Sequence, residues 1–130
     1  MHQTEYSVSE TWLDSFGHVN NARYLEIYEQ ARWDWLHAAG MSAAGIHASG
    51  IGPVVLQANL RFLRELLPRQ VIVISSRCSA IDKKIITLTQ QMHFKDSQEL
   101  ASELVLTAGI MDLKARKLIL PPDEWLAAFS

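Results

Sequence analysis

Residues 14–40 of the 130-residue chain, DSFGHVNNARYLEIYEQARWDWLHAAG, decide the fold. A helical wheel of residues 21–39 collects the apolar side chains on one continuous stripe and leaves charged side chains on the opposite side. Asn20 or Asn21 is suited to cap the start of this helix, and Gly40 is suited to end it. The rest of the chain must therefore cover one apolar stripe, which consists of Tyr24, Ile27, Tyr28, Ala31, Trp35, Ala38 and Ala39.

The segments on either side of this helix carry strand patterns, in which apolar and polar side chains alternate or β-branched residues follow one another. The predicted strands lie at residues 3–13, 54–62, 85–94, 100–111 and 117–120, with one more beginning at residue 71. Residues 41–52 predict a loop, and residues 123–129 a last helical turn. This order predicts one α+β domain over residues 1–130, in which a mostly antiparallel sheet of five to six strands wraps around the helix. Its long edge strands favour a dimer.

Composition excludes several classes of protein. With 48% hydrophobic and 20% charged residues, the chain resembles an ordinary soluble globular protein. A net charge of -2 offers no basic surface for nucleic acid, and no apolar run approaches the roughly 20 residues of a membrane span. The single cysteine, Cys78, cannot form an internal disulfide, which fits a reducing compartment. We expect a cytoplasmic protein without nucleic-acid or membrane partners.

Residues 14–24 also carry the candidate chemistry. Asp14 is a lone carboxylate, and Gly17 and two asparagines separate it from the start of the helix. The first N–H groups of a helix lack intrahelical acceptors and carry partial positive charge. A thioester carbonyl placed there would meet a base and an electropositive pocket together. Taken alone, an aspartate before a helix is also explained as a turn former or a cap.

The pattern Asp14-x-x-Gly17-His18-Val19-Asn20-Asn21-x-x-Tyr24, continued by Leu25-Glu26 and Glu29-x-Ala31-Arg32, resembles one enzyme family. It is similar to the hotdog-fold acyl-CoA thioesterases of the 4-hydroxybenzoyl-CoA thioesterase type, and most similar to the bacterial long-chain acyl-CoA thioesterases. The resemblance implies a hotdog domain that hydrolyses an acyl-CoA to a free acid and CoA without a cofactor or a metal. It also implies a homodimer or homotetramer with the active site at the subunit contact.

The resemblance assigns roles to residues around the start of the helix. Asp14 would be the catalytic carboxylate, which either activates water or attacks the carbonyl itself. The backbone N–H of Asn21 would stabilise the oxyanion, a contact whose loss typically costs about 3 to 4 kcal/mol of barrier. Gly17 would let the backbone approach the thioester. His18 is either a base or a residue that holds the loop through hydrogen bonds. Glu29, about two turns into the helix, is the alternative catalytic carboxylate or else a solvated surface residue.

Substrate contacts are expected along the helix stripe and the strand that follows the helix. The acyl tail would run near Tyr24, Tyr28, Val54, Val55 and Leu56, although core packing explains Tyr24 equally well. Trp33 projects from the otherwise polar face, which suggests a substrate wall or a subunit contact. The candidates for binding the CoA phosphates are Arg61, Arg64 and Lys83.

Two other functions stay open. A hydratase or dehydratase acting on a hydroxyacyl thioester would use His18 with a paired acid. A non-catalytic acyl-CoA binding or sensing protein would hold its ligand without consuming it. The sequence has no Gly-x-Ser-x-Gly motif for a serine hydrolase and no paired histidine spacing for zinc.

Overall fold

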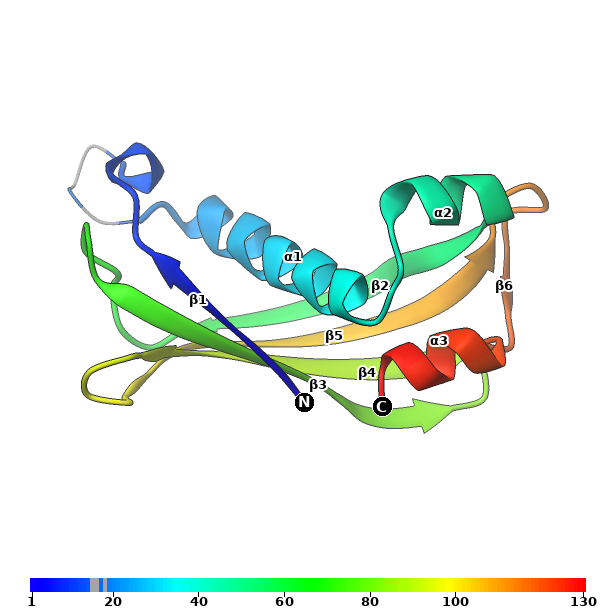
Figure 1. Cartoon of the computed structure of the whole chain (residues 1–130). Coiled ribbons are helices and arrows are strands. Elements are labelled where there is room, and N and C mark those ends of the chain that lie inside the picture. The colour runs from blue at the N-terminus through cyan, green and yellow to red at the C-terminus, as the bar shows by residue number, and fades with distance from the viewer. Residues whose placement is uncertain (15–16, 18) are drawn as a thin grey trace.

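A curved antiparallel sheet wraps around one long helix in the computed structural model, which describes residues 1–14, 17 and 19–130 (Figure 1). The strand order is β1-β3-β4-β5-β2, and β6 pairs with the end of β5. The strands are β1 (His2–Ser7), β2 (Ile51–Phe62), β3 (Val71–Asp82), β4 (Ile85–Phe94), β5 (Leu100–Asp112) and β6 (Lys117–Ile119). The paired strands run antiparallel, which confirms the predicted α+β hotdog architecture.

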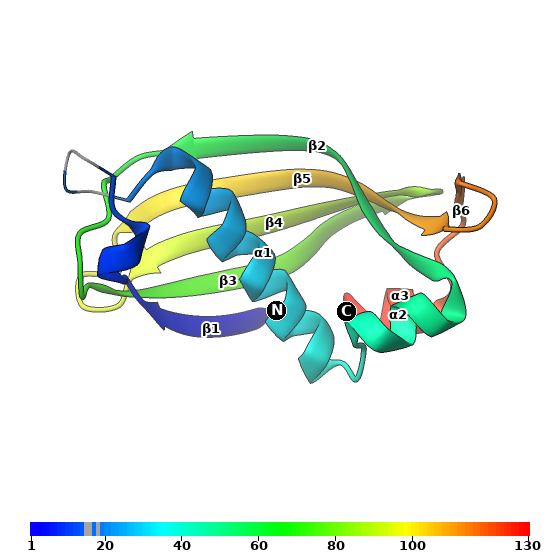
Figure 2. The ribbon, with the colours of Figure 1, turned by 90° about the horizontal axis from the view of Figure 1, so that it is seen from above.

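Helix α1 (Asn21–Ala38) begins and ends close to the predicted positions. The side-chain oxygen of Asn20 caps its start by accepting a hydrogen bond from the backbone N–H of Ala22 at 2.9 Å. Gly40 follows its end with a φ of +83°, a left-handed conformation that favours glycine. The helix lies across the concave face of the sheet, as the view from above shows (Figure 2).

The apolar stripe of α1 forms the core together with the inner face of the sheet. Most of the predicted stripe is buried, including Tyr28 and Ala31. The prediction was wrong in the last turn, where Ala38 and Ala39 are exposed and Leu36 is buried instead. The sheet contributes fully buried side chains to the same cluster, among them Ile72, Ile74, Met92, Leu104 and Ile110.

Two predicted elements differ from the structure because serine side chains cap short helices. The predicted first strand, residues 3–13, ends at Ser7, and a 3-10 helix (Glu10–Trp12) follows it. Ser9 accepts a hydrogen bond from the N–H of Thr11 there. The predicted loop 41–52 contains helix α2 (Ala43–Ser49), whose cap Ser42 accepts from the N–H of Gly45 at 3.0 Å. The predicted last helical turn is confirmed as helix α3 (Asp123–Ala128).

Strand β2 forms one edge of the sheet and is largely exposed along its length. Val55, Leu56 and Phe62 each keep nearly half of their surface accessible, whereas the neighbouring strand β5 is mostly buried. A long edge strand with exposed apolar side chains is a template for pairing with another chain. Among the helices that the structure describes, none is both long and apolar enough to cross a membrane.

Candidate active site

The turn that carries Asp14 closes onto the start of α1. Leu13 and Val19 form an isolated antiparallel bridge, and the N–H of Asn20 donates to the carbonyl of Trp12 at 3.2 Å. Within this loop, the N–H of Gly17 donates to the carbonyl of Asp14 at 3.2 Å. Gly17 has a φ of +82°, so glycine is required by the backbone itself. Asp14 is half-buried and directly follows Leu13, which pairs with Val19 just before the helix.

The first backbone N–H groups of α1 differ in whether they have a hydrogen-bond acceptor. The N–H of Ala22 is capped by the Asn20 side chain, and the N–H of Arg23 donates to the Asn20 carbonyl at 2.9 Å. None of the described residues accepts a hydrogen bond from the N–H of Asn21. The N–H groups at a helix start lack intrahelical acceptors and are suited to an anion or a polarised carbonyl oxygen. The prediction for His18 lies outside the described residues.

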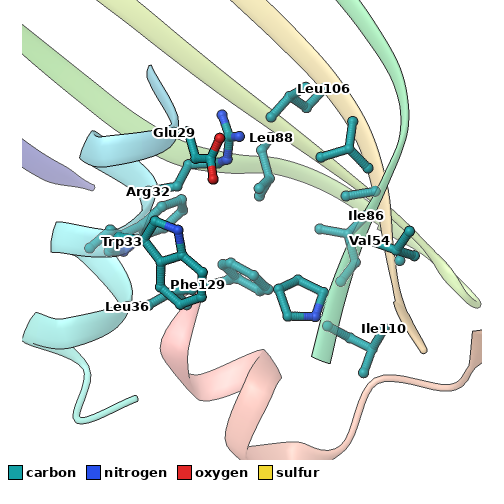
Figure 3. A pocket seen from close by; sticks show the side chains of 15 residues that line it. Glu29, Arg32, Trp33, Leu36, Val54, Ile86, Leu88, Leu106, Ile110 and Phe129 are labelled. Atoms are coloured by element: carbon teal, nitrogen blue, oxygen red, sulfur yellow. The ribbon is translucent and has the colours of Figure 1, made fainter. Parts of the chain in front are cut away.

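A cavity of about 240 Å³ lies between the second half of α1, the sheet and α3 (Figure 3). Two charged side chains, Glu29 and Arg32, lie together on one side of it. The remainder of its wall is apolar and includes Trp33, which the helical wheel places on the polar face. The other lining residues are Trp35, Leu36, Pro53, Val54, Val55, Ile86, Leu88, Leu106, Ala108, Gly109, Ile110 and Phe129.

A buried polar network supports the charged side of the cavity. Arg32 donates from its guanidinium to the side-chain oxygen of Gln90 at 2.9 Å. The fully buried amide of Gln90 donates to the backbone carbonyl of Tyr28 at 3.1 Å and to the hydroxyl of Ser76 at 2.9 Å. Burial lowers the pKa of Arg32, and the nearby Glu29 carboxylate opposes that effect. Sequence reasoning missed Gln90, because it falls at an apolar position of an alternating strand.

The predicted acyl contacts divide into two groups. Val54 and Val55 line the cavity, while Leu56 lies at a β-bulge of β2 and is exposed. Tyr24 is buried in the core, where its ring meets that of Phe62 edge to face at 5.0 Å. Tyr28 is fully buried, and burial raises the pKa of both tyrosines. Neither tyrosine contributes to the cavity wall, so the structure favours core packing for both.

The three residues predicted to bind the CoA phosphates differ in whether a carboxylate already pairs with them. Arg61 forms an ion pair with Glu103 at 3.7 Å, and Arg64 forms one with Glu99 at 3.3 Å. Lys83 occupies the turn between β3 and β4, and no carboxylate of the described residues lies within ion-pair distance of it. The described residues bring no three histidine, cysteine or carboxylate side chains together as a metal site.

Comparison with known proteins agrees with this geometry. A family model of the thioesterase-like superfamily matches residues 8–129. The long-chain acyl-CoA thioesterase FadM of Escherichia coli is 32% identical over 117 residues, which cover 90% of this chain and 88% of FadM. The crystal structure of the probable thioesterase YbaW from Escherichia coli has a TM-score of 0.83 and 30% identity, over 97% of this chain and 94% of that one.

A more distant structure shows the same fold. The protein SAV2348 of Staphylococcus aureus, solved in complex with CoA, has a TM-score of 0.88 at 17% identity, over 97% of this chain and 79% of that one. The match to the family model covers strands β2 to β6, the central helix and the turn that carries Asp14. The chain therefore belongs to the thioesterase-like superfamily and has the hotdog fold.

Proposed function

We propose that this protein is an acyl-CoA thioesterase, in which Asp14 and the N–H of Asn21 act on the thioester carbonyl. The observation that carries the proposal is the start of α1, where the N–H of Asn21 has no acceptor among the described residues and the Asp14 turn folds against it. The identity with FadM, which is named as a long-chain acyl-CoA thioesterase, supports the same reaction. A single thiol and this relationship support a cytoplasmic enzyme.

The reaction needs one base and one oxyanion donor. Asp14 accepts a proton from water while the water oxygen bonds to the carbonyl carbon, and the N–H of Asn21 hydrogen-bonds to the resulting oxyanion. The tetrahedral intermediate then breaks its carbon–sulfur bond, and the CoA thiolate leaves with the proton from Asp14. In the alternative route Asp14 attacks the carbonyl directly, and water then hydrolyses the mixed anhydride. Both routes consume one water and regenerate Asp14.

In this proposal a second subunit brings Asp14 and the cavity together. Trp33 lies roughly 18 Å along the helix axis from Asn21, so within one chain the cavity and the Asp14 turn are well separated. The cavity is bordered by Pro53 and Val54 at the start of β2, whereas Phe62 at its end packs on Tyr24 near the start of α1.

Antiparallel pairing of two β2 edges would resolve this separation. It would place the Phe62 end of β2 in one chain against the Pro53 end of β2 in the other. Because Phe62 lies near the start of α1 and Pro53 borders the cavity, Asp14 of one subunit would lie beside the cavity of its neighbour. The exposed apolar side chains of β2 support such a homodimer. The turn between β3 and β4 lies at the same end of the molecule as the start of β2 (Figure 2). Lys83, which belongs to this turn, would then face the incoming CoA phosphates.

Thiol release from a panel of acyl-CoAs, measured for wild type, Asp14→Asn and Glu29→Gln, tests the proposal. We expect turnover by wild type, a fall in kcat of about 10²- to 10⁴-fold in Asp14→Asn, and a much smaller change in Glu29→Gln. Unchanged thermal denaturation would show that both variants fold. The reverse order of effects would assign catalysis to Glu29. Thermal stabilisation by acyl-CoA without any thiol release would identify a binding protein instead.

A further inference from the structure

We propose that the cavity beside α1 is an acyl-binding chamber whose far end is set by Phe129, so that the enzyme prefers acyl groups of roughly eight to ten non-hydrogen atoms. This inference rests on the proposed thioesterase function and adds the size of its substrate. It differs from the substrate class in the name of FadM, because most of a long acyl chain would extend beyond a chamber of this volume.

The volume of the cavity sets the size of its occupant. An engineered cavity of about 150 Å³ holds benzene, which has six carbon atoms. At the same packing, about 240 Å³ holds roughly ten non-hydrogen atoms, and at the volume of liquid water about eight. A medium-length saturated chain or a substituted benzoyl group has this size. Drug-sized ligands need larger pockets, of about 300 Å³ or more.

The polarity of the wall orients the acyl group. Glu29 and Arg32 lie together on one side of the cavity, and Phe129 and Ile110 lie further along it (Figure 3). A carbonyl and its thioester are polar and suit the charged side, while methylene groups gain most from the apolar walls. The tail therefore points away from Glu29 and Arg32 toward Phe129, along a wall that includes Val54 and Leu88.

Phe129 is held firmly enough to act as a stop. It follows helix α3, and only 7% of its surface is exposed. Its ring packs edge to face on Trp35 of α1, with centroids 5.3 Å apart, and lies 5.9 Å from the ring of Trp125. Aromatic pairs at these separations favour one arrangement. A longer chain would have to displace this cluster, which closes the core between α1 and α3.

The test compares kcat/KM for saturated acyl-CoAs from butanoyl to palmitoyl, and for 4-hydroxybenzoyl-CoA, in wild type, Phe129→Ala and Phe129→Trp. For wild type we expect kcat/KM to rise about fourfold with each added methylene until the chain reaches Phe129, and then to stop rising. Phe129→Ala should move this limit to chains about two to four carbons longer, and Phe129→Trp should shorten it. A higher kcat/KM for 4-hydroxybenzoyl-CoA than for the best saturated chain would mean that the chamber is shaped for a ring.

Leu126→Ala is the matched control, because Leu126 lies on helix α3 three residues before Phe129, is half-buried and does not line the cavity. It should loosen α3 to a similar degree but leave the chain-length limit unchanged. A wild type that prefers palmitoyl-CoA, with the same profile in Phe129→Ala, would overturn the inference.

The chain-length limit can also be measured by binding. A failure of the proposed thioesterase function can therefore be distinguished from a failure of the chamber proposal. If wild type releases no thiol, calorimetric titration with non-hydrolysable thioether analogues of the same acyl-CoAs still measures the chain length that each variant accepts. A shift of the preferred analogue in Phe129→Ala would support the chamber, and the absence of any shift would overturn it.

Discussion

Arg32 donates a hydrogen bond to Gln90 at 2.9 Å and so connects the cavity side of α1 to the middle of β4. Gln90 in turn holds the backbone carbonyl of Tyr28, one helical turn before Arg32. The two side chains thus satisfy each other in a buried part of the sheet, where the hydroxyl of Ser76 on β3 also accepts a hydrogen bond from Gln90. A buried polar network of this kind stabilises the fold only while each member keeps its partners.

Removing both members of this pair should therefore cost less than the sum of the two single removals. We expect Arg32→Met and Gln90→Met each to lower the free energy of unfolding by about 1 to 3 kcal/mol, because each leaves a buried polar group unsatisfied. The double variant should lose clearly less than the sum of the two, as measured by urea denaturation. Arg23→Met is the control, since its exposed ion pair with Glu26 should contribute about 0 to 1 kcal/mol. Additive losses in the double variant would contradict the coupling.

The Asn20 cap should matter for both stability and turnover. Asn20→Ala removes the acceptor for the N–H of Ala22, and we expect a loss of about 1 kcal/mol in the free energy of unfolding. Because the same residue fixes the first turn of α1, kcat should also fall when the Asn21 N–H shifts relative to Asp14. Asn20→Asp and Asn20→Ser keep a capping oxygen and should restore stability. A variant without any capping oxygen but with wild-type stability and kcat would refute this role.

The exposed edge of β2 should determine the oligomeric state. Leu56→Lys places a charge on that edge and should convert a dimer to a monomer, as measured by sedimentation, with loss of thiol release but retained secondary structure. Ile81→Lys is a closely matched control, because both side chains are 46% exposed but Ile81 lies on β3, away from the β2 edge. If Ile81→Lys dissociates the protein and Leu56→Lys does not, the subunits meet elsewhere.

High pH should unfold the protein through its tyrosines. Burial raises the pKa of Tyr24 and of Tyr28, and burial together with the hydrogen bond to Asp34 raises that of Tyr6. In the unfolded chain these phenols ionise near pH 10, while in the folded protein they stay neutral. Stability is therefore fully present below about pH 10 and is lost as the pH rises above it, by up to about 1.4 kcal/mol per pH unit for each buried phenol.

Urea denaturation at a series of alkaline pH values, followed together with tyrosinate absorbance, measures this effect. The absorbance change should accompany unfolding and not precede it. Tyr28→Phe should flatten the pH dependence, because that position no longer ionises in the unfolded chain. Tyrosinate absorbance that appears near pH 10 in the still folded protein would contradict the prediction.

Periodicity alone could predict the central helix and most of the sheet. The stripe of α1 repeats over several turns, and Ile85–Phe94 was predicted with its observed bounds. Helix α2 was not predicted, because a helix of seven residues is too short to show a periodic pattern. Only the cap at Ser42 marks its start. The candidate catalytic turn could be located because its residues are contiguous in sequence.

The complete wall of the cavity could not be predicted, because it assembles distant segments, although Val54 and Val55 were expected to contact the substrate and Trp33 to form a substrate wall or a subunit contact. Glu29, Val54, Leu106 and Phe129 come from four elements or their ends, and only the curvature of the sheet brings them together. The hydrogen bond between Arg32 and Gln90 could not be predicted from the sequence either. In the sequence, Gln90 only interrupts the apolar face of an alternating strand. Its partner, the guanidinium of Arg32, comes from the helix that packs on this strand.

The distance between the Asp14 turn and the cavity has a genetic consequence. Under the proposed pairing each active site takes its carboxylate from one chain and its acyl chamber from the other. Coexpression of Asp14→Asn with a chain whose chamber is filled, such as Val54→Trp, should then rescue activity that neither chain has alone. Random assembly would restore about a quarter of the wild-type turnover, since half of the dimers are mixed and each mixed dimer holds one intact site. Two inactive alleles would thus complement each other within one small enzyme.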